Sequence, residues 1–329
     1  MDVDRLLLAI DGGQTATKSL IARADGTVLG GGLGDPSDHF HIEGGIEKNR
    51  RAIVGAIDDA LAATGCPPEQ ICAVGLGLTG AGSRVPAIVE EMVRERASPR
   101  EITVVPDYVT NLAGASGGEP GVVLIAGGGA IGYGVTAQGD EAIAGGYGFL
   151  LGDEGSAFNI GLRAIAAASR GADFRDQQTM LTEVVVDHFE VERVRQLPRI
   201  IYAAGFSRER ISLLAPNVVR TAEAGDSAAI EIIRNAGEEL ARTALGVMRQ
   251  LFEPGAAVVV YMTGGVFKSG ALLLDPFRTL LQQQWPEAEP RMPRFPPAVG
   301  GLILAAQSVG IVVDDTWLDT VDAALDRTT

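Results

Sequence analysis

The feature of the sequence that most constrains its fold is a strand–glycine turn–strand–turn–strand pattern that occurs twice. The first copy, over residues 6–31, reads LLLAI, the turn DGGQ, and then TATKSLIARADGTVLGGG, which the Asp25-Gly26 pair divides into a hairpin. The second copy begins at Val122 as VVLIA, continues through glycines and GYGVTA to a Gln-Gly-Asp turn, and ends in EAIAGG. Each copy predicts three consecutive antiparallel strands.

Helical and apolar patterns alternate after each copy. After the first copy we expect a helix over 44–65, a strand over 73–78, a helix through 85–93 and a strand over 102–107, which gives the order βββαβαβ. After the second we expect a helix over 156–169, a long helical region to about 252, a strand over 256–262, and helices over 272–284 and 298–310. Mixed sheets with helices on both faces are the natural packing for this order.

The glycines of VVLIAGGGAIGYG place Gly127, Gly129 and Gly132 at the G-x-G-x-x-G spacing of dinucleotide-binding proteins. That fingerprint needs a helix directly after it, because the pyrophosphate lies on the helix N-terminus. The residues that follow indicate strand, turn and strand instead. An oxidoreductase interpretation therefore rests on spacing alone. We favour the interpretation that two matched hairpin turns bind a polyphosphate through their backbone N–H groups. The alternative is that each glycine segment is only a turn between two strands.

Composition narrows the function classes. A chain of 329 residues makes one large or two medium domains. Its net charge of −15 argues against a nucleic-acid partner, but not against a nucleotide held by local N–H groups and a metal ion. No apolar run approaches the ~20 residues of a membrane span, and the N-terminus does not resemble a signal peptide. Cys66 and Cys72 lack C-x-x-C spacing, which favours a reduced, cytoplasmic setting.

Five segments resemble, in this order, the BadF/BadG/BcrA/BcrD-type ATPase family: DGGQTATKS, VVPDYVTNLAG, VVLIAGGGAIGYG, GGYGFLLGDEGSAF and VVVYMTGGVFKSG. The resemblance is to its N-acetylglucosamine kinase-like branch, in the actin-like sugar kinase superfamily. It implies a two-lobed α/β, ribonuclease H-like fold with a duplicated βββαβαβ core, a mixed five-stranded sheet in each lobe and ATP in the interlobe cleft. It also implies an N-terminal lobe of residues 1–113, joined by a C-terminal helix at about 298–329, and a C-terminal lobe of residues 114–297.

The resemblance implies three segments that hold ATP and Mg²⁺: the two glycine turns and the TGG loop at Thr263. Asp11, at a strand end, is suited to hold hydrated Mg²⁺, and the Lys18 cation would lie near the γ-phosphate. Glycines in the TGG loop let the backbone approach a flat base. The candidate nucleotide contacts are Gly12, Gly13, Gln14, Thr15, Lys18, Gly127, Gly128, Gly129, Gly264 and Gly265.

On the acceptor side, Asp107 follows the strand ITVVP, at the sheet edge where α/β proteins bind ligands. The resemblance implies that it accepts the proton of the attacking sugar hydroxyl. A helix N-cap is the simpler alternative. Asp153 matches the family's sugar-hydroxyl ligand, and its alternative is to cap the helix that starts near Ser156. The candidate substrate contacts are Asp38, His39, Gly146, Tyr147 and Asp153.

Three departures from the family pattern bear on rate and substrate. The second turn reads Gly127-Gly128-Gly129-Ala130 where these kinases usually have Gly-Thr-Gly-Ser, so its phosphate contacts would be backbone N–H groups only. Asp38 or His39 stands near the position of a sugar-binding Asn, and a carboxylate there could favour a free amine. Tyr147 stands where a Trp is common, and it could cover a sugar ring or lie in the core.

The expected function is ATP-dependent phosphorylation of an amino sugar, with N-acetylglucosamine and its 6-phosphate favoured as substrate and product. Glucosamine or another hexosamine is the first alternative. A regulatory ATPase that activates a partner enzyme is the second, although those branches carry iron–sulfur cysteines near the second turn and this chain has none there. We expect a small-molecule sugar substrate, no nucleic acid and no membrane, with a homodimer as one option.

Overall fold

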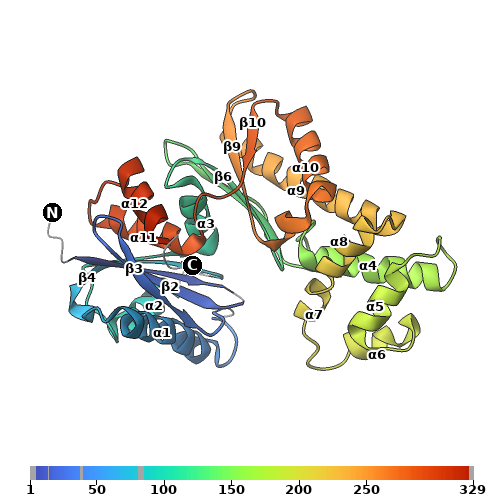
Figure 1. Ribbon diagram of the computed structural model, residues 1–329, viewed down its shortest axis with the longest axis horizontal. Helices are drawn as coiled ribbons and strands as arrows, with labels where there is room; N and C mark the ends of the chain where they lie inside the picture. Colours follow the sequence, from blue (N-terminus) through green and yellow to red (C-terminus); the bar gives the residue numbers. More distant parts are fainter. Residues whose placement is uncertain (1–4, 14, 38–39, 81–84, 326–329) are drawn as a thin grey trace. The chain divides into compact units, whose positions relative to one another are not determined.

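The computed structural model describes residues 5–13, 15–37, 40–80 and 85–325 (Figure 1). Contacts divide the chain into two compact units. Unit 1 comprises Met1–Pro120 and Met292–Thr329, and unit 2 comprises Gly121–Arg291. Since the C-terminal segment returns to the first unit, the chain enters and leaves unit 2 once.

Unit 1 contains a five-stranded mixed sheet in the order β3-β2-β1-β4-β5. The first copy of the repeated pattern forms its antiparallel part, and β4 and β5 extend it in parallel on the other side of β1. The strands are β1 (Leu6–Gly12), β2 (Thr17–Arg23), β3 (Val28–Gly34), β4 (Ile71–Leu78) and β5 (Glu101–Pro106).

Helices cover both faces of this sheet, because the side chains of β1 alternate between two apolar cores. Leu6, Leu8 and Ile10 pack in one core with helices α1 and α2, while Leu7 and Ala9 pack in the other with α11 and α12. The helices of unit 1 are α1 (Gly45–Thr64), η1 (Pro68–Gln70), α2 (Val85–Arg94), α3 (Asp107–Ser116), α11 (Pro297–Ser308) and α12 (Asp315–Leu325).

The expectation of one C-terminal helix at about 298–329 was wrong. Helix α11 ends at Ser308, and Gly310 adopts a left-handed backbone conformation with φ 75°. A separate helix, α12, then begins at Asp315 and buries Trp317 in the second core of unit 1. Glycine interrupts a helix readily because it adopts positive φ at little cost.

Unit 2 repeats the plan of unit 1, with a sheet in the order β10-β9-β6-β7-β8. The second copy of the pattern again forms the antiparallel part, and β9 and β10 extend it in parallel. The strands are β6 (Gly121–Ala126), β7 (Ala130–Val135), β8 (Glu141–Gly145), β9 (Val258–Thr263) and β10 (Ala288–Arg291). The two mixed five-stranded sheets confirm the expected duplicated α/β fold.

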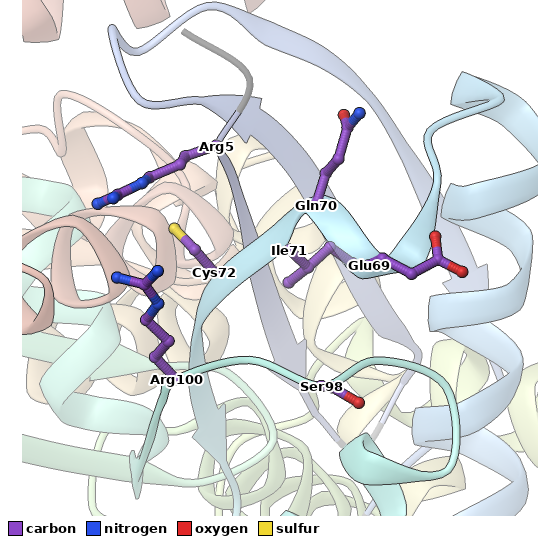
Figure 2. Close-up of a pocket in the computed structure, with 7 residues that line it drawn as sticks. All are labelled: Arg5, Glu69, Gln70, Ile71, Cys72, Ser98 and Arg100. Atoms are coloured by element: carbon purple, nitrogen blue, oxygen red, sulfur yellow. The ribbon is translucent and has the colours of Figure 1, made fainter. Parts of the chain in front are cut away.

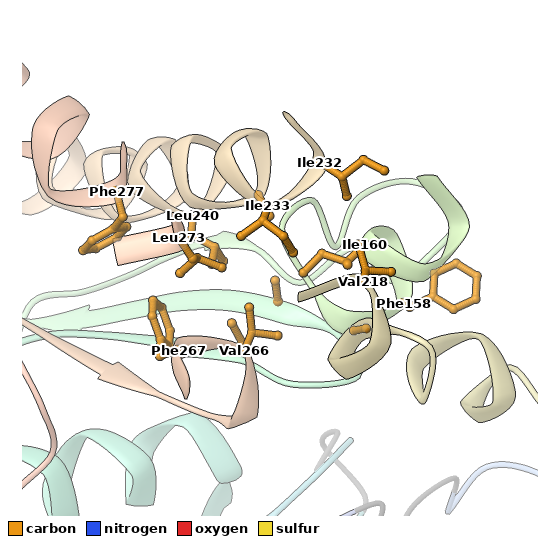
Figure 3. Packing of buried hydrophobic residues seen from close by; sticks show 14 of the residues in the cluster. Phe158, Ile160, Val218, Ile232, Ile233, Leu240, Val266, Phe267, Leu273 and Phe277 are labelled. Atoms are coloured by element: carbon orange, nitrogen blue, oxygen red, sulfur yellow. The ribbon is translucent and has the colours of Figure 1, made fainter. Parts of the chain in front are cut away.

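A larger helical layer packs on the sheet of unit 2. Figure 3 shows Phe267 and Phe277 beside Leu240 and Leu273, where η3, α9 and α10 meet. The helices are α4 (Ala157–Ala172), α5 (Leu181–Phe189), η2 (Val194–Gln196), α6 (Leu197–Ile201), α7 (Glu209–Ser212), α8 (Ala215–Glu223), α9 (Ser227–Leu251), η3 (Gly265–Ser269) and α10 (Ala271–Gln284). No helix in the described part of the chain combines the length and apolar character needed to cross a bilayer.

Candidate functional site

Three strand ends of unit 1 bring the predicted catalytic and metal residues to one edge of its sheet. Strands β1, β4 and β5 are parallel, and their register pairs Gly12 with Leu78 and Leu78 with Pro106. The carboxyl ends of the three strands therefore lie side by side. Asp11 is the penultimate residue of β1, and Asp107 directly follows β5.

Thr79, which directly follows β4, connects this edge through hydrogen bonds. Its hydroxyl donates to Asp107 Oδ2 over 2.7 Å, and its N–H donates to the Gly12 carbonyl oxygen over 3.1 Å. Thr79 thus joins the predicted base to the first glycine turn. Sequence reasoning did not select Thr79, because its partners are distant in sequence and no local pattern marks it.

The carboxyl groups of Asp11 and Asp107 are both partly removed from water. Burial first, and the Asp107 charge second, raise the pKa of Asp11 to about 6, against the lowering effect of Lys18. Burial also raises the pKa of Asp107, while hydrogen bonds from Thr79 and from backbone N–H groups lower it. Two carboxyl groups whose charges interact in a partly dry site favour either protonation of one of them or a bound cation.

A magnesium ion fits this donor set. Mg²⁺ is usually held by one or two carboxylates together with water and substrate phosphates, rather than by a full protein cage. Among the described residues no group of three or more His, Cys, Asp and Glu side chains could hold a metal. The Asp11 carboxylate meets this smaller requirement, and a cation would stabilise its charged form, which burial and the Asp107 charge disfavour.

Close packing against β4 fixes the helix that carries Asp107. Helix α3 begins at Asp107, and the Thr110 hydroxyl donates to the Asp107 carbonyl oxygen over 2.9 Å. A methyl group at Gly77 in β4 would collide with the Thr110 side chain. Asp107 is thus the first residue of α3, whose N-cap is Pro106, so the alternative of an N-cap aspartate was wrong. The Asp107 carboxylate instead bonds across the sheet edge to Thr79.

The first glycine turn joins β1 to β2 next to this edge. The Gly13 N–H donates to the Ala16 carbonyl oxygen, and the Gly13 carbonyl oxygen accepts from the Ser37 N–H. Thr15 is exposed, and Lys18 is exposed and pairs across the strands with Asp11. Gln14 lies outside the described residues, as do Asp38 and His39, so those three predicted contacts stay predictions.

The second glycine turn joins β6 to β7 as an antiparallel hairpin, which excludes the dinucleotide-binding arrangement of strand and helix. The Gly127 N–H donates to the Gly129 carbonyl oxygen over 2.9 Å. Within the described part of the chain, the N–H groups of Gly128 and Gly129 make no hydrogen bond. Two adjacent N–H groups without protein acceptors are the backbone form of an anion site.

The N-terminus of helix α4 adds to the positive potential at this turn. The Ala157 N–H, in the first turn of α4, donates to the Gly127 carbonyl oxygen over 2.8 Å. Ser156 is the N-cap, since its hydroxyl accepts from the Asn159 N–H. Helix N-termini favour anions because their N–H groups and dipole point outward.

Asp153 lies against the second turn and does not cap α4. Its Oδ1 accepts from the Ala130 N–H over 3.2 Å, and its carboxylate packs against Gly129. Asp153 adopts φ 61°, which is unusual for a residue other than glycine. Burial raises the pKa of its carboxyl group, although the Ala130 N–H lowers it. The structure therefore brings the predicted sugar ligand to the predicted phosphate turn of the same unit.

Other predicted contacts of unit 2 lie near the same turn. Thr263 ends β9 beside Ile125 of β6, and Gly264, with φ 101°, packs so closely on Ala126 that no side chain would fit. Gly265 begins η3. The Gly146 N–H donates to the Ala130 carbonyl oxygen, which anchors the segment after β8. Tyr147 is 75% exposed, so it is not a core residue.

Arg208 also contributes to this part of unit 2, although no sequence motif marks it. Its guanidinium lies 4.1 Å from the centre of the Phe149 ring, and its charge lowers the pKa of Asp153. It comes from the helical region between α4 and α9, far from any glycine motif. A cation next to Asp153 offsets part of the negative charge beside the turn.

Comparison with known proteins places the chain in a family. The model of the BadF/BadG/BcrA/BcrD ATPase family matches residues 8–305. The chain belongs to this family. The predicted family is thus confirmed.

The chain is similar to curated proteins that are named as kinases of amino sugars. It is 30% identical to the N-acetylmuramic acid/N-acetylglucosamine kinase of Clostridium acetobutylicum, with 92% of this chain and 98% of that protein covered. It is 26% identical to a glucosamine kinase of Vibrio cholerae, with 71% and 77% covered. Both relatives align with most of the chain, so their likeness includes both units.

Solved structures show the same fold. One from Chromobacterium violaceum, which carries the provisional name N-acetylglucosamine kinase, is 29% identical, has a TM-score of 0.75 and covers 92% of this chain and 99% of its own. A glucokinase of the ROK family from Streptomyces griseus is 16% identical, with a TM-score of 0.55 and coverages of 92% and 98%. The actin-like sugar kinase fold expected for this family member is therefore confirmed.

Proposed function

We propose that this ATPase-family protein is an amino-sugar kinase that transfers the γ-phosphoryl group of ATP to the 6-hydroxyl of N-acetylglucosamine. The observation that carries the proposal is the group formed by Asp11, Thr79 and Asp107 at the carboxyl edge of the unit 1 sheet. The curated relatives support the class, because they are named as kinases of amino sugars.

Asp107 is the proposed base. Its Oδ2 accepts from Thr79, and a carboxylate has enough lone pairs to accept the substrate hydroxyl as well. Burial raises the pKa of Asp107, and a carboxylate with a raised pKa is a stronger base near neutral pH. The hydroxyl oxygen then forms a bond to the γ-phosphorus as the bond to the β–γ bridging oxygen breaks, and ADP leaves.

Backbone N–H groups and Lys18 are the proposed phosphate contacts. The free N–H groups of Gly128 and Gly129 would bind phosphate oxygens without moving, since the hairpin already fixes them. Asp11 would hold Mg²⁺ together with water and phosphate oxygens. When bound, that ion supplies neutralising charge to the phosphates. The two cysteines are free thiols, in keeping with a cytoplasmic location.

The substrate is tested by a coupled assay of ADP release over a panel of sugars. The panel contains N-acetylglucosamine, glucosamine, N-acetylmuramic acid and glucose, because the relatives differ in the substrates they are named for. We expect the highest kcat/KM with N-acetylglucosamine, and phosphorus NMR to place the new phosphate on the 6-oxygen. A higher kcat/KM for another sugar would show that N-acetylglucosamine is not the preferred substrate, while the proposed kinase activity would stand.

Asp107→Asn tests the proposed base, because the amide is isosteric but cannot take up the proton. We expect kcat to fall about 10²- to 10⁴-fold, the usual contribution of a general base. Thr110→Ser is the matched control on the same helix, since it keeps the hydroxyl that bonds to the Asp107 carbonyl oxygen. Sugar-stimulated turnover that survives Asp107→Asn unchanged would remove this role of Asp107.

A further inference from the structure

A fully buried pair of polar side chains lies next to the first glycine turn. The Ser37 hydroxyl donates to Asn49 Oδ1 over 2.6 Å, and Asn49 Nδ2 donates to the Gly45 carbonyl oxygen over 2.8 Å. Both Ser37 and Asn49 are 0% exposed. Burying polar side chains costs free energy that an apolar pair would not cost. What a satisfied buried pair contributes in return is one fixed arrangement of the segments that it joins.

Ser37 connects this pair to the glycine turn itself. Its N–H donates to the Gly13 carbonyl oxygen over 3.0 Å, and a methyl group at Gly12 would lie only 3.1 Å from the Ser37 hydroxyl oxygen. In the same segment, the Asp35 carbonyl oxygen accepts from the Thr17 hydroxyl over 2.7 Å. Because Gly12 ends β1 and Thr17 begins β2, the segment that contains Ser37 contacts both sides of the turn.

Asn49 connects the pair to a helix whose position the sheet fixes. Helix α1 packs on β3 with no side chain between them, since a methyl group at Gly34 would lie 2.2 Å from the Ala52 carbonyl oxygen. Ala52 follows Asn49 by about one helical turn. The hydrogen bond from Ser37 to Asn49 therefore joins the glycine turn to a part of α1 that is held close to the strand.

We propose that Ser37 and Asn49 are positioning residues of the nucleotide site, whose hydrogen bond holds the first glycine turn in the conformation that receives the phosphates of ATP. This inference rests on the proposed kinase, in which that turn contacts ATP, and it adds two residues to the site. A turn that is fixed before binding loses little conformational freedom when the phosphates bind. Without the hydrogen bond the turn would adopt this conformation less often, so ATP would bind more weakly.

Ser37→Ala and Asn49→Ala each remove this hydrogen bond. Initial rates of ADP release are measured against ATP concentration, with the sugar of highest kcat/KM at saturation. We expect the KM for ATP to rise about 3- to 10-fold, which is the effect of one neutral hydrogen bond. The kcat should stay within about threefold, because the turn binds ATP in the ground state and in the transition state alike.

The double variant and a binding measurement complete the test. Because both substitutions remove the same bond, Ser37→Ala with Asn49→Ala should raise the KM no further than the stronger single change does. Isothermal titration calorimetry with Mg²⁺ present gives the Kd for ATP, which should rise by the same factor without any need for turnover. Ser37→Ala removes one oxygen atom only, so it tests the proposal even if Asn49→Ala does not fold.

Ser19→Ala is the matched control. Ser19 is also buried, and its hydroxyl donates to the Ala56 carbonyl oxygen of α1 over 2.7 Å. It pairs with Ile10 within the sheet, however, and not with the turn. Ser19→Ala should therefore lower the unfolding midpoint in urea about as much as Ser37→Ala does, but leave the KM and Kd for ATP unchanged.

Ser98→Ala controls for the loss of a serine hydroxyl at the other edge of the sheet. Ser98 lines a small pocket where Cys72 and Arg100 lie near the starts of β4 and β5 (Figure 2). The glycine turn lies at the carboxyl end of β1, which runs parallel to β4. Since Ser98 is exposed, Ser98→Ala should change neither the unfolding midpoint nor the KM for ATP.

Two results would overturn the inference. One is an unchanged KM and Kd for ATP in Ser37→Ala. The other is an equal rise in Ser19→Ala and Ser37→Ala, which would mean that any lost buried hydrogen bond in this unit weakens ATP binding. Either result leaves the proposed kinase intact, because the original protein would still release ADP in response to a sugar. The kinase fails separately, if no sugar of the panel stimulates ADP release, and the Kd values would then still decide the role of Ser37.

Discussion

A single hydroxyl, that of Thr79, sets the position of the proposed base. Thr79→Val removes the hydrogen bond to Asp107 but keeps the shape of the side chain. A hydrogen bond to a charged group contributes about 1.5–3 kcal/mol, so we expect kcat to fall roughly 10- to 100-fold. The KM values for ATP and sugar should change little, because Thr79 acts through Asp107. Steady-state kinetics that determine kcat and KM separately test this prediction.

Thr79→Ser is the matched control for this prediction. Serine keeps the donor, so it should restore kcat to within a few-fold of the original. A serine variant as slow as the valine variant would show that the methyl group, and therefore packing, is what matters at Thr79.

The raised pKa of Asp11 has a consequence for stability. Between its ordinary value of 3.8 and its folded value of about 6, the folded chain binds more of the proton than the unfolded chain does. The free energy of unfolding therefore falls as pH rises through this window. Asp11→Asn stays neutral, so it should be more stable than the original above pH 6, by about 1–2 kcal/mol after allowance for partial solvent contact.

Urea unfolding at pH 5 and pH 7.5, without divalent cations, measures this difference. We expect the advantage of Asp11→Asn to be larger at pH 7.5 and its kinase activity to be lost. A charged Asp11 lowers the stability of the folded protein when no cation neutralises it, and residues that lower stability in this way are typical of functional sites. An equal advantage at both pH values would mean that Asp11 is not the group that titrates.

At the scale of elements, the packing of α3 on β4 determines where Asp107 lies. Gly77→Ala would force the Thr110 side chain and α3 away from the sheet. Overpacking of this kind costs about 1–3 kcal/mol of stability, and a shift of Asp107 should lower kcat as well. Gly55→Ala is the control, because Gly55 lies inside α1 with open space around it. That change should raise stability by about 0.5–1 kcal/mol.

The elements also show what sequence could and could not predict. The strands of the repeated pattern were predictable, because buried alternation and Asp-Gly or Gln-Gly-Asp turns mark them locally. Strand β10 was missed, since the residues AEPR carry no apolar run, and it forms only because β9 offers a parallel edge. Helix α12 was missed as a separate helix, although the Asp314 carboxylate accepts from the Trp317 N–H at its start.

The candidate site also contains residues that the sequence could predict and residues that it could not. Asp11, Asp107 and the glycine turns were predictable as candidates, because each belongs to a motif that is continuous in sequence. Thr79 and Arg208 were not, since each acquires its role from partners at least tens of residues away. The interaction of Asp153 with Ala130 was also hidden, because only the path of the chain after β8 returns its carboxylate to the second turn.

At the scale of the whole molecule, no apolar core of the described residues is shared between the two units, and each unit has its own tryptophan. The chain holds two tryptophans. Trp285 is buried in unit 2 and donates its Nε1–H to the Ala256 carbonyl oxygen. Trp317 is buried in unit 1 and donates to the Ala24 carbonyl oxygen. Single-tryptophan variants can therefore report the unfolding of each unit separately.

Trp285→Phe leaves a reporter in unit 1, and Trp317→Phe leaves one in unit 2. Because the cores share no buried residue, we expect the two fluorescence transitions in urea to have different midpoints. Asp11→Asn should then move the transition seen by Trp317 and leave that seen by Trp285 unchanged, since the titrating pair lies in unit 1. If both reporters instead follow one transition, and both shift with Asp11→Asn, the two units unfold cooperatively despite their separate cores.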